Sequence, residues 1–184
     1  HVMEQSRVIT ADAETALGQT LPMPLPLLFS RWYGPISPVK AVRDQAGDWS
    51  AAGQTRTVVQ VGGGSMREEL TVVDPPNTFG YTLTNVTGPL SPLVDHIDGE
   101  WLFAPTGTGT TVTWRWTVHP KSATAGLAMP GFAALWRGFA RQGLEERSDE
   151  LLRRGRSAHV LWVSRVAAWP GSRGCISTSA MSGS

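Results

Sequence analysis

The chain has 184 residues, with 16 lysines and arginines against 15 acidic residues. Its length fits one folded domain with a sizeable core. A net charge of +1 without a Lys/Arg-rich run disfavours nucleic acid as a partner, and without a run of about 18 apolar residues we expect no membrane span. A single cysteine, Cys175, and the absence of a signal-peptide pattern favour a cytoplasmic protein. We expect a monomer or a homodimer.

The N-terminal part of the chain predicts one strand followed by short helices. VMEQSRVI, residues 2–9, is the first strand, and Thr10 or Asp12 is placed to cap a helix after it. Five prolines between residues 22 and 38 exclude one continuous helix there, although LPLLFSRWY, residues 25–33, is long enough for about two turns. We therefore expect two short helices and a loop.

Six further strands are predicted after this loop. Turn sequences such as GGG, DPPN and TGTG divide them, and their close spacing indicates an antiparallel sheet of six to seven strands. GGGS at residues 62–65 is interpreted as a hairpin turn rather than a phosphate-binding loop, because it lies between two strands. The predicted strands are residues 39–45, 54–61, 65–73, 78–86, 99–105 and 110–118.

The period of the apolar residues changes to that of a helix over residues 122–154. Gly138 and Gly143 allow a close approach to the sheet, and Gly155 is predicted to end the helix. Residues 156–184 lack acidic residues and fit a docking strand, an amphipathic surface segment or a disordered tail. The residues predicted to share one helical face are Phe132, Trp136, Phe139, Leu144 and Leu151.

Alternation along the strands predicts which side chains face inward. Arg56 and Arg115 are predicted to face outward. The inward sets are Met66, Glu68, Leu70 and Val72; Phe79, Tyr81 and Leu83; and Val112, Trp114, Trp116 and Val118.

Two of these inward residues are candidates for chemistry. Burial would raise the pKa of the Glu68 carboxyl and suit it to general acid or base catalysis. Alternatively, Glu68 pairs with an arginine, lies at a cavity rim, or is turned outward by a bulge. The Tyr81 hydroxyl is suited to orienting a ligand carbonyl, and otherwise the ring simply packs in the core.

We expect no metal and no cofactor. DHIDGE, residues 95–100, contains one histidine and three carboxylates, but its spacing matches no known metal site and it is predicted to be a polar loop. His119, at the end of a strand, has no visible partner in the sequence. Neither feature indicates catalysis.

Several segments, in their order, resemble one known family. They are GQTRTV (53–58), ELTVVDPP (69–76), Tyr81, and GEWLF (99–103) followed by GTGTTVTWRWTVHP (107–120). The pattern resembles the polyketide cyclase/dehydrase and lipid-transport family, the SRPBCC group of the START-like, Bet v 1-like superfamily. The resemblance implies an α+β helix-grip fold, in which a curved antiparallel sheet surrounds a long C-terminal helix and two short helices follow the first strand. It implies a ligand-binding domain at residues 3–155 and a tail at 156–184, partly disordered or peripheral.

The resemblance also implies a cavity between sheet and helix for a small hydrophobic molecule, such as a lipid or polyketide. We therefore expect binding or transport, with Arg31, Trp32 and Tyr33 at the cavity mouth. One alternative is a polyketide cyclase, aromatase or dehydratase acting through Glu68 and Tyr81, although such relatives use an arginine that alternation does not supply here. Another is a non-catalytic interaction partner that uses the tail. The expected ligand-binding residues are Tyr33, Phe79, Tyr81, Phe103, Trp114, Trp116, Phe132, Trp136 and Phe139.

Overall fold

A computed structural model describes the backbone of residues 1–167 and the side chains of residues 1–150 and Arg153. The chain divides into two compact units, His1–Asp149 and Glu150–Ser184. The first unit contains the whole sheet, the short helices and the beginning of the last helix. None of the helices within residues 1–167 combines the length and hydropathy that a membrane span requires.

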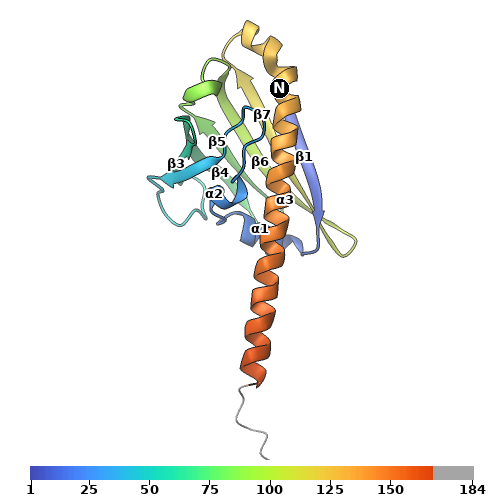
Figure 1. The fold of residues 1–184 in the computed structure, drawn as a ribbon. Coiled ribbons are helices and arrows are strands. Elements are labelled where there is room, and N and C mark those ends of the chain that lie inside the picture. The colour runs from blue at the N-terminus through green and yellow to red at the C-terminus, as the bar shows by residue number, and fades with distance from the viewer. Residues whose placement is uncertain (168–184) are drawn as a thin grey trace, which may run out of the picture. The chain divides into compact units, whose positions relative to one another are not determined.

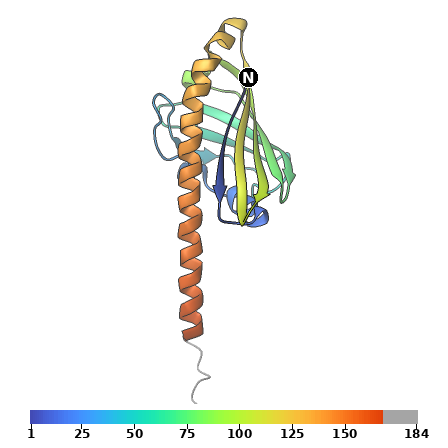
Figure 2. The same ribbon diagram turned by 90° about the vertical axis from the view of Figure 1, so that its right-hand side faces the viewer.

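Seven strands form one antiparallel sheet in the order β1-β7-β6-β5-β4-β3-β2 (Figure 1). The sheet curves beside residues 123–149 of the last helix (Figure 2), so the predicted α+β helix-grip fold is confirmed. The strands are β1 Val2–Ile9, β2 Val39–Arg43, β3 Thr55–Gln60, β4 Ser65–Asp74, β5 Thr78–Thr84, β6 Val94–Thr106 and β7 Gly109–Pro120. The helices are α1 Ala13–Thr20, α2 Leu25–Leu28, the 3₁₀ turn η1 Gly88–Leu90 and α3 Ala123–Ala167.

The two short helices form where the sequence predicts them. Asp12 caps α1 by accepting a hydrogen bond from the backbone N–H of Thr15 at 2.8 Å, and this bond lowers the pKa of the Asp12 carboxyl. α2 is a single turn rather than two, because it begins directly after Pro24 and contains only four residues. The segment between β1 and β2 therefore consists of two short helices joined by loops.

Two strand predictions differ from the structure. A register shift between Leu70 and Val72 in β4 turns Val72 outward, where it is 48% exposed, so the predicted inward set ends at Leu70. β6 begins at Val94, which makes DHIDGE part of a strand rather than a loop. Its polar residues face solvent while Ile97 is fully buried, so this segment alternates as a half-buried strand does.

The predicted end of α3 at Gly155 is wrong, since the helix continues to Ala167. A glycine costs a helix interior about 1 kcal/mol relative to alanine but does not by itself end the helix. A docking strand is therefore excluded for residues 156–167, and residues 168–184 lie outside the described chain. The close approaches predicted at Gly138 and Gly143 are made to Tyr33 and Phe29, before β2, rather than to the sheet.

α3 packs against the sheet through an aromatic cluster. Trp136 is fully buried, and its ring centroid lies 5.1 Å from that of Trp114 and 5.4 Å from that of Trp116. Phe29 completes the contact from the α2 side, with its centroid 5.0 Å from Trp114. The inner indoles of β7 therefore touch the helix directly, and protein fills most of the space between sheet and helix.

A buried arginine joins α3 to α1. Arg147 is fully buried and donates hydrogen bonds to the Thr20 hydroxyl at 2.6 Å and to the Ala16 carbonyl at 2.8 Å. Burial lowers the pKa of its guanidinium to about 10, so the group is still positively charged at neutral pH. The cation lies at the C-terminus of α1, where the partial negative charge of the helix end favours it.

Candidate functional site: a small pocket beneath the sheet

The inner face of the sheet, α2 and α3 line a small, partly open and mainly apolar pocket. Its volume is about 70 Å³, and its wall includes five of the predicted ligand-binding residues. Pockets that hold drug-sized ligands usually measure about 300–1,000 Å³. The five residues are Phe79, Tyr81, Trp114, Trp116 and Phe139.

The other four predicted ligand-binding residues lie elsewhere. Phe103 and Trp136 are buried in the core, where Phe103 stacks near Phe79. Tyr33 is partly exposed and covers Gly138, while Phe132 lines a second cavity described below. Whether any of the nine residues binds a ligand stays a prediction.

A buried ion pair forms the polar part of the pocket wall. Arg56 Nε lies 2.5 Å from Glu68 Oε2, and both side chains are almost fully buried. The Arg56 guanidinium also lies over the Trp49 ring, 3.8 Å from its centroid. Glu68 thus faces inward as predicted. It pairs with an arginine, which was one of the predicted alternatives to a role in acid–base catalysis.

The prediction that Arg56 faces outward is wrong. Arg56 and Glu68 are register partners across β3 and β4, and directly opposed residues project on the same face. Val58, two positions after Arg56, is buried, so alternation counted from Val58 would have placed the arginine inside. Arg115 does face outward, where it forms ion pairs with Glu4 and Glu100.

Burial and pairing act on the Glu68 carboxyl in opposite directions. Desolvation raises its pKa, while the charge of Arg56 and the hydrogen bond from Arg56 partly offset this rise. A carboxyl whose pKa is raised by burial is a frequent component of acid–base sites, and also of structural ion pairs.

The Tyr81 hydroxyl is held by two indole groups. Its oxygen accepts hydrogen bonds from Trp114 Nε1 at 2.7 Å and from Trp116 Nε1 at 2.9 Å. Burial raises the pKa of Tyr81, so the hydroxyl stays neutral and keeps its proton. Within residues 1–150 this hydroxyl donates no hydrogen bond, so its proton is available to an acceptor in the pocket.

Gly99 fixes the position of the Tyr81 ring. The two residues are register partners in β5 and β6, and a Cβ atom at Gly99 would lie 2.1 Å from Tyr81 Cζ. The ring therefore lies directly over the glycine, and any larger residue would displace it. This requirement depends on the strand register, which the isolated GEWLF segment does not reveal.

A second, larger cavity lies beside the beginning of α3. Its volume is about 310 Å³, and Phe132 and Leu135 of α3 face Pro35 and Ile36 of the loop before β2 across it. Gln60 lines both this cavity and the small pocket, so the two spaces adjoin at that side chain. The larger cavity lies at the lower end of the size range of ligand pockets.

The curved antiparallel sheet, its packing against α3 and the pocket between them define a START-like, Bet v 1-like protein. The chain belongs to the family described as polyketide cyclase / dehydrase and lipid transport, whose model matches residues 1–150. A search of curated proteins found no match.

Solved structures with the same fold differ widely in sequence. Protein TTHA0849 from Thermus thermophilus is 19% identical with a TM-score of 0.62, and the match covers 84% of this chain and 99% of that one. The major latex-like protein 151 from Panax ginseng is 13% identical, with a TM-score of 0.56 and coverage of 82% and 96%. DynU16, from the dynemicin biosynthetic locus, is 12% identical, with a TM-score of 0.54 and coverage of 82% and 46%. At these identities the likeness extends to the fold alone.

Proposed function

We propose that this protein binds a small, mainly apolar molecule that carries a hydrogen-bond acceptor such as a carbonyl oxygen. The observation that carries the proposal is the Tyr81 hydroxyl, whose oxygen is occupied by two indole N–H groups and whose proton has no acceptor within residues 1–150. A fixed donor in an otherwise apolar wall orients a ligand and selects for an acceptor. The family to which the chain belongs supports this interpretation.

The size of the pocket restricts the ligand. A cavity of about 70 Å³ has room for only a few water molecules, so a one- or two-ring compound must displace side chains to enter. The adjoining cavity of about 310 Å³ supplies room if Gln60 moves aside. Because neither space alone suits a long lipid, we favour a compact ring compound over a lipid chain.

Tyr81→Phe is expected to weaken binding of an aromatic ketone such as 2-acetylnaphthalene about 5- to 100-fold, the usual effect of losing one hydrogen bond to a buried group. Binding of the matched hydrocarbon 2-ethylnaphthalene should change little, because it offers no acceptor. Displacement of an apolar fluorescent dye measures both affinities. Tyr33→Phe is the matched control, since Tyr33 is the other of the two tyrosines and lies outside the pocket wall.

Native mass spectrometry of gently purified protein provides an independent test, and a bound apolar compound is the expected result. The proposal is contradicted if neither compound displaces the dye from the wild-type protein. It is equally contradicted if Tyr81→Phe, checked as folded by its circular dichroism spectrum, binds ketone and hydrocarbon as the wild type does.

An enzymatic function is the second candidate, because Arg56, Glu68 and Tyr81 line one pocket. Strand alternation had placed no arginine inside the pocket, which argued against a polyketide cyclase, aromatase or dehydratase. The buried Arg56 beside Glu68 removes that objection. Glu68→Gln distinguishes the candidates: it should abolish turnover of a cyclising or dehydrating substrate and leave the binding of 2-acetylnaphthalene largely intact.

Three further expectations stay proposals. We propose that residues 3–155 form the binding domain and that residues 156–184 are a separable tail. Under the alternative that the protein is a non-catalytic interaction partner, this tail contacts the other protein. Deleting residues 156–184 should leave ligand binding unchanged, and a changed mass in solution would favour the interaction alternative. A cytoplasmic location is the third expectation, and cell fractionation tests it.

A further inference from the structure

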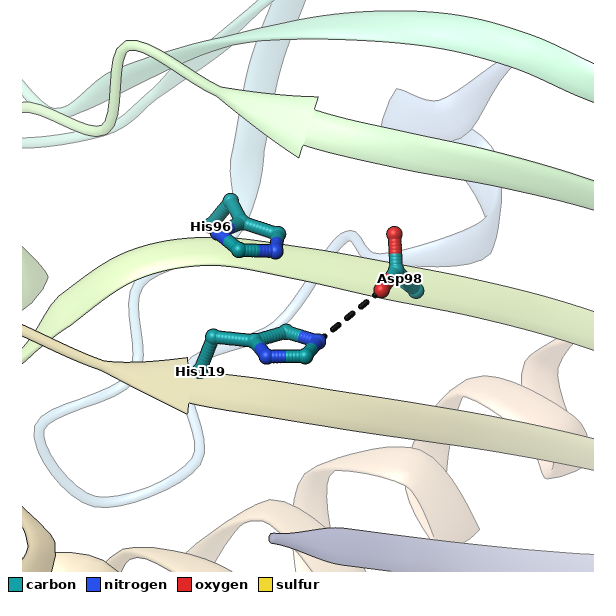
Figure 3. Close-up of side chains that lie close together, drawn as sticks. All are labelled: His96, Asp98 and His119. Atoms are coloured by element: carbon teal, nitrogen blue, oxygen red, sulfur yellow. Dashed lines mark hydrogen bonds and ion pairs between the residues drawn. The ribbon is translucent and has the colours of Figure 1, made fainter.

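Two histidines and an aspartate, residue types that often bind metal ions, lie close together on the outer face of the sheet, away from the pocket. His96 and Asp98 belong to β6 and His119 belongs to β7, where His96 and His119 are register partners (Figure 3). The prediction that His119 has no partner is wrong, because its Nε2 lies 2.9 Å from Asp98 Oδ2. Its ring also stacks on His96, with centroids 4.0 Å apart. The pairing of β6 with β7 creates this group, which DHIDGE alone does not contain.

The three side chains lie close enough together for rotation about their side-chain bonds to bring one ligand atom from each to a single metal ion. One ligand atom from each lies within 4.8 Å of the others. Zinc binds imidazole nitrogen at about 2.0–2.1 Å, which places the ligand atoms of a tetrahedral ion about 3.3 Å apart. The two rings are stacked nearly parallel, at 10°, so their lone pairs run side by side and the rings must rotate out of the stack to direct both lone pairs at one ion. Both rings are partly exposed, which leaves space on the solvent side for this rotation.

The surroundings of His96 favour this use. Its Nδ1 lies 2.8 Å from Asp95 Oδ2, and the tautomer that donates from Nδ1 to this carboxylate presents the lone pair of Nε2 to a metal ion. Figure 3 shows a ring nitrogen of His96 on the side where Asp98 lies. A carboxylate that holds the far nitrogen of a histidine is the usual second layer of a zinc site.

We propose that His96, Asp98 and His119 bind one first-row divalent cation of the Zn²⁺ type, with water in the fourth position. Two imidazoles and one carboxylate suit Zn²⁺ better than Mg²⁺ or Ca²⁺, which prefer oxygen ligands alone. Asp95 acts as a positioning residue through His96. The ion would join the start of β6 to the end of β7, and α3 begins three residues after β7. A bound ion would thus hold together the two strands of the hairpin that precedes α3.

Calorimetric titration of Zn²⁺ into the full chain, prepared without an added histidine tag, tests the proposal. The parent protein should be His1→Ala/His159→Ala, because His96 and His119 are then the only histidines of the four in the sequence. We expect one ion per chain, with affinity at least about 10-fold weaker in His119→Ala and in Asp98→Asn. Asp95→Asn should weaken binding about 10-fold while keeping one ion per chain.

Glu100→Gln is the matched control, since Glu100 lies on the same strand and face but outside the group, and its affinity should equal the parent's. Co²⁺ should give the visible absorption of a four- or five-coordinate site in the parent and lose it in His119→Ala. The proposal is overturned if no saturable one-to-one binding is found, or if His119→Ala binds Zn²⁺ as the parent does.

Discussion

Glu68→Leu is expected to lower the free energy of unfolding by about 3–5 kcal/mol at pH 7, because it leaves the Arg56 guanidinium buried without its partner. Arginine cannot relieve this cost by losing its proton. Urea unfolding followed by tryptophan fluorescence measures the change.

Arg56→Met should cost less, and its cost should depend on pH. The Glu68 carboxyl, left without Arg56, can take up a proton, and this limits the penalty at pH 7 to about 3 kcal/mol. The limit is the free energy of protonating a glutamate at pH 7, since its ordinary pKa is 4.5 and one pKa unit corresponds to about 1.4 kcal/mol. Burial raises the folded-state pKa of Glu68 above its unfolded value, so the protonated group contributes stability that is complete below pH 4.5. That stability is lost as pH rises through the raised pKa. The penalty of Arg56→Met should therefore shrink as pH falls toward 4.5.

The double variant Arg56→Met/Glu68→Leu completes the comparison. Removing both charges removes both desolvation penalties, so its stability should equal or exceed that of the wild type by about 1–4 kcal/mol. A double variant that is less stable than Glu68→Leu alone would contradict this account. If the double variant keeps the wild-type affinity for 2-acetylnaphthalene, Tyr81 is sufficient as the polar group of the pocket.

Gly99→Ala is expected to lower the free energy of unfolding by about 2–4 kcal/mol, because the new methyl group occupies the place of the Tyr81 ring. Overpacking a core costs about 1–3 kcal/mol, and displacing Tyr81 also leaves the indole N–H groups of Trp114 and Trp116 without their acceptor. Ketone binding should fall along with stability, since the donor moves. Denaturant unfolding and near-ultraviolet circular dichroism report these two changes.

Gly80→Ala is the matched control for this substitution. Gly80 lies on the adjoining strand, and a Cβ atom there meets its nearest neighbour, Thr71 Oγ1, at 3.3 Å, which a small shift of that side chain relieves. Its effect should stay within about 1 kcal/mol, the full span of strand preferences. Equal losses at Gly80 and Gly99 would show that glycine is needed for the strand itself and not for Tyr81.

Local patterns determined the architecture because they act over a few residues. Period-two alternation placed Trp114, Trp116, Phe79 and Tyr81 on inner faces, and all four are buried there. The predicted cap at Asp12 formed as well. Alternation failed at Val72, because one extra residue in β4 reversed the faces of the strand. The predicted helix end failed at Gly155, because the low helix propensity of one glycine did not end the helix.

The composition and spacing of the sequence thus determined the seven-strand sheet, the short helices, the long last helix and an inner face rich in aromatic groups. Only the tertiary structure decided that Arg56 pairs with Glu68, that two indoles hold the Tyr81 hydroxyl over Gly99, and that His96, Asp98 and His119 meet. It also decided that the pocket between sheet and helix is small. These contacts join residues distant in sequence, and they depend on strand register and on how completely side chains fill a volume. Neither quantity is encoded in any short segment.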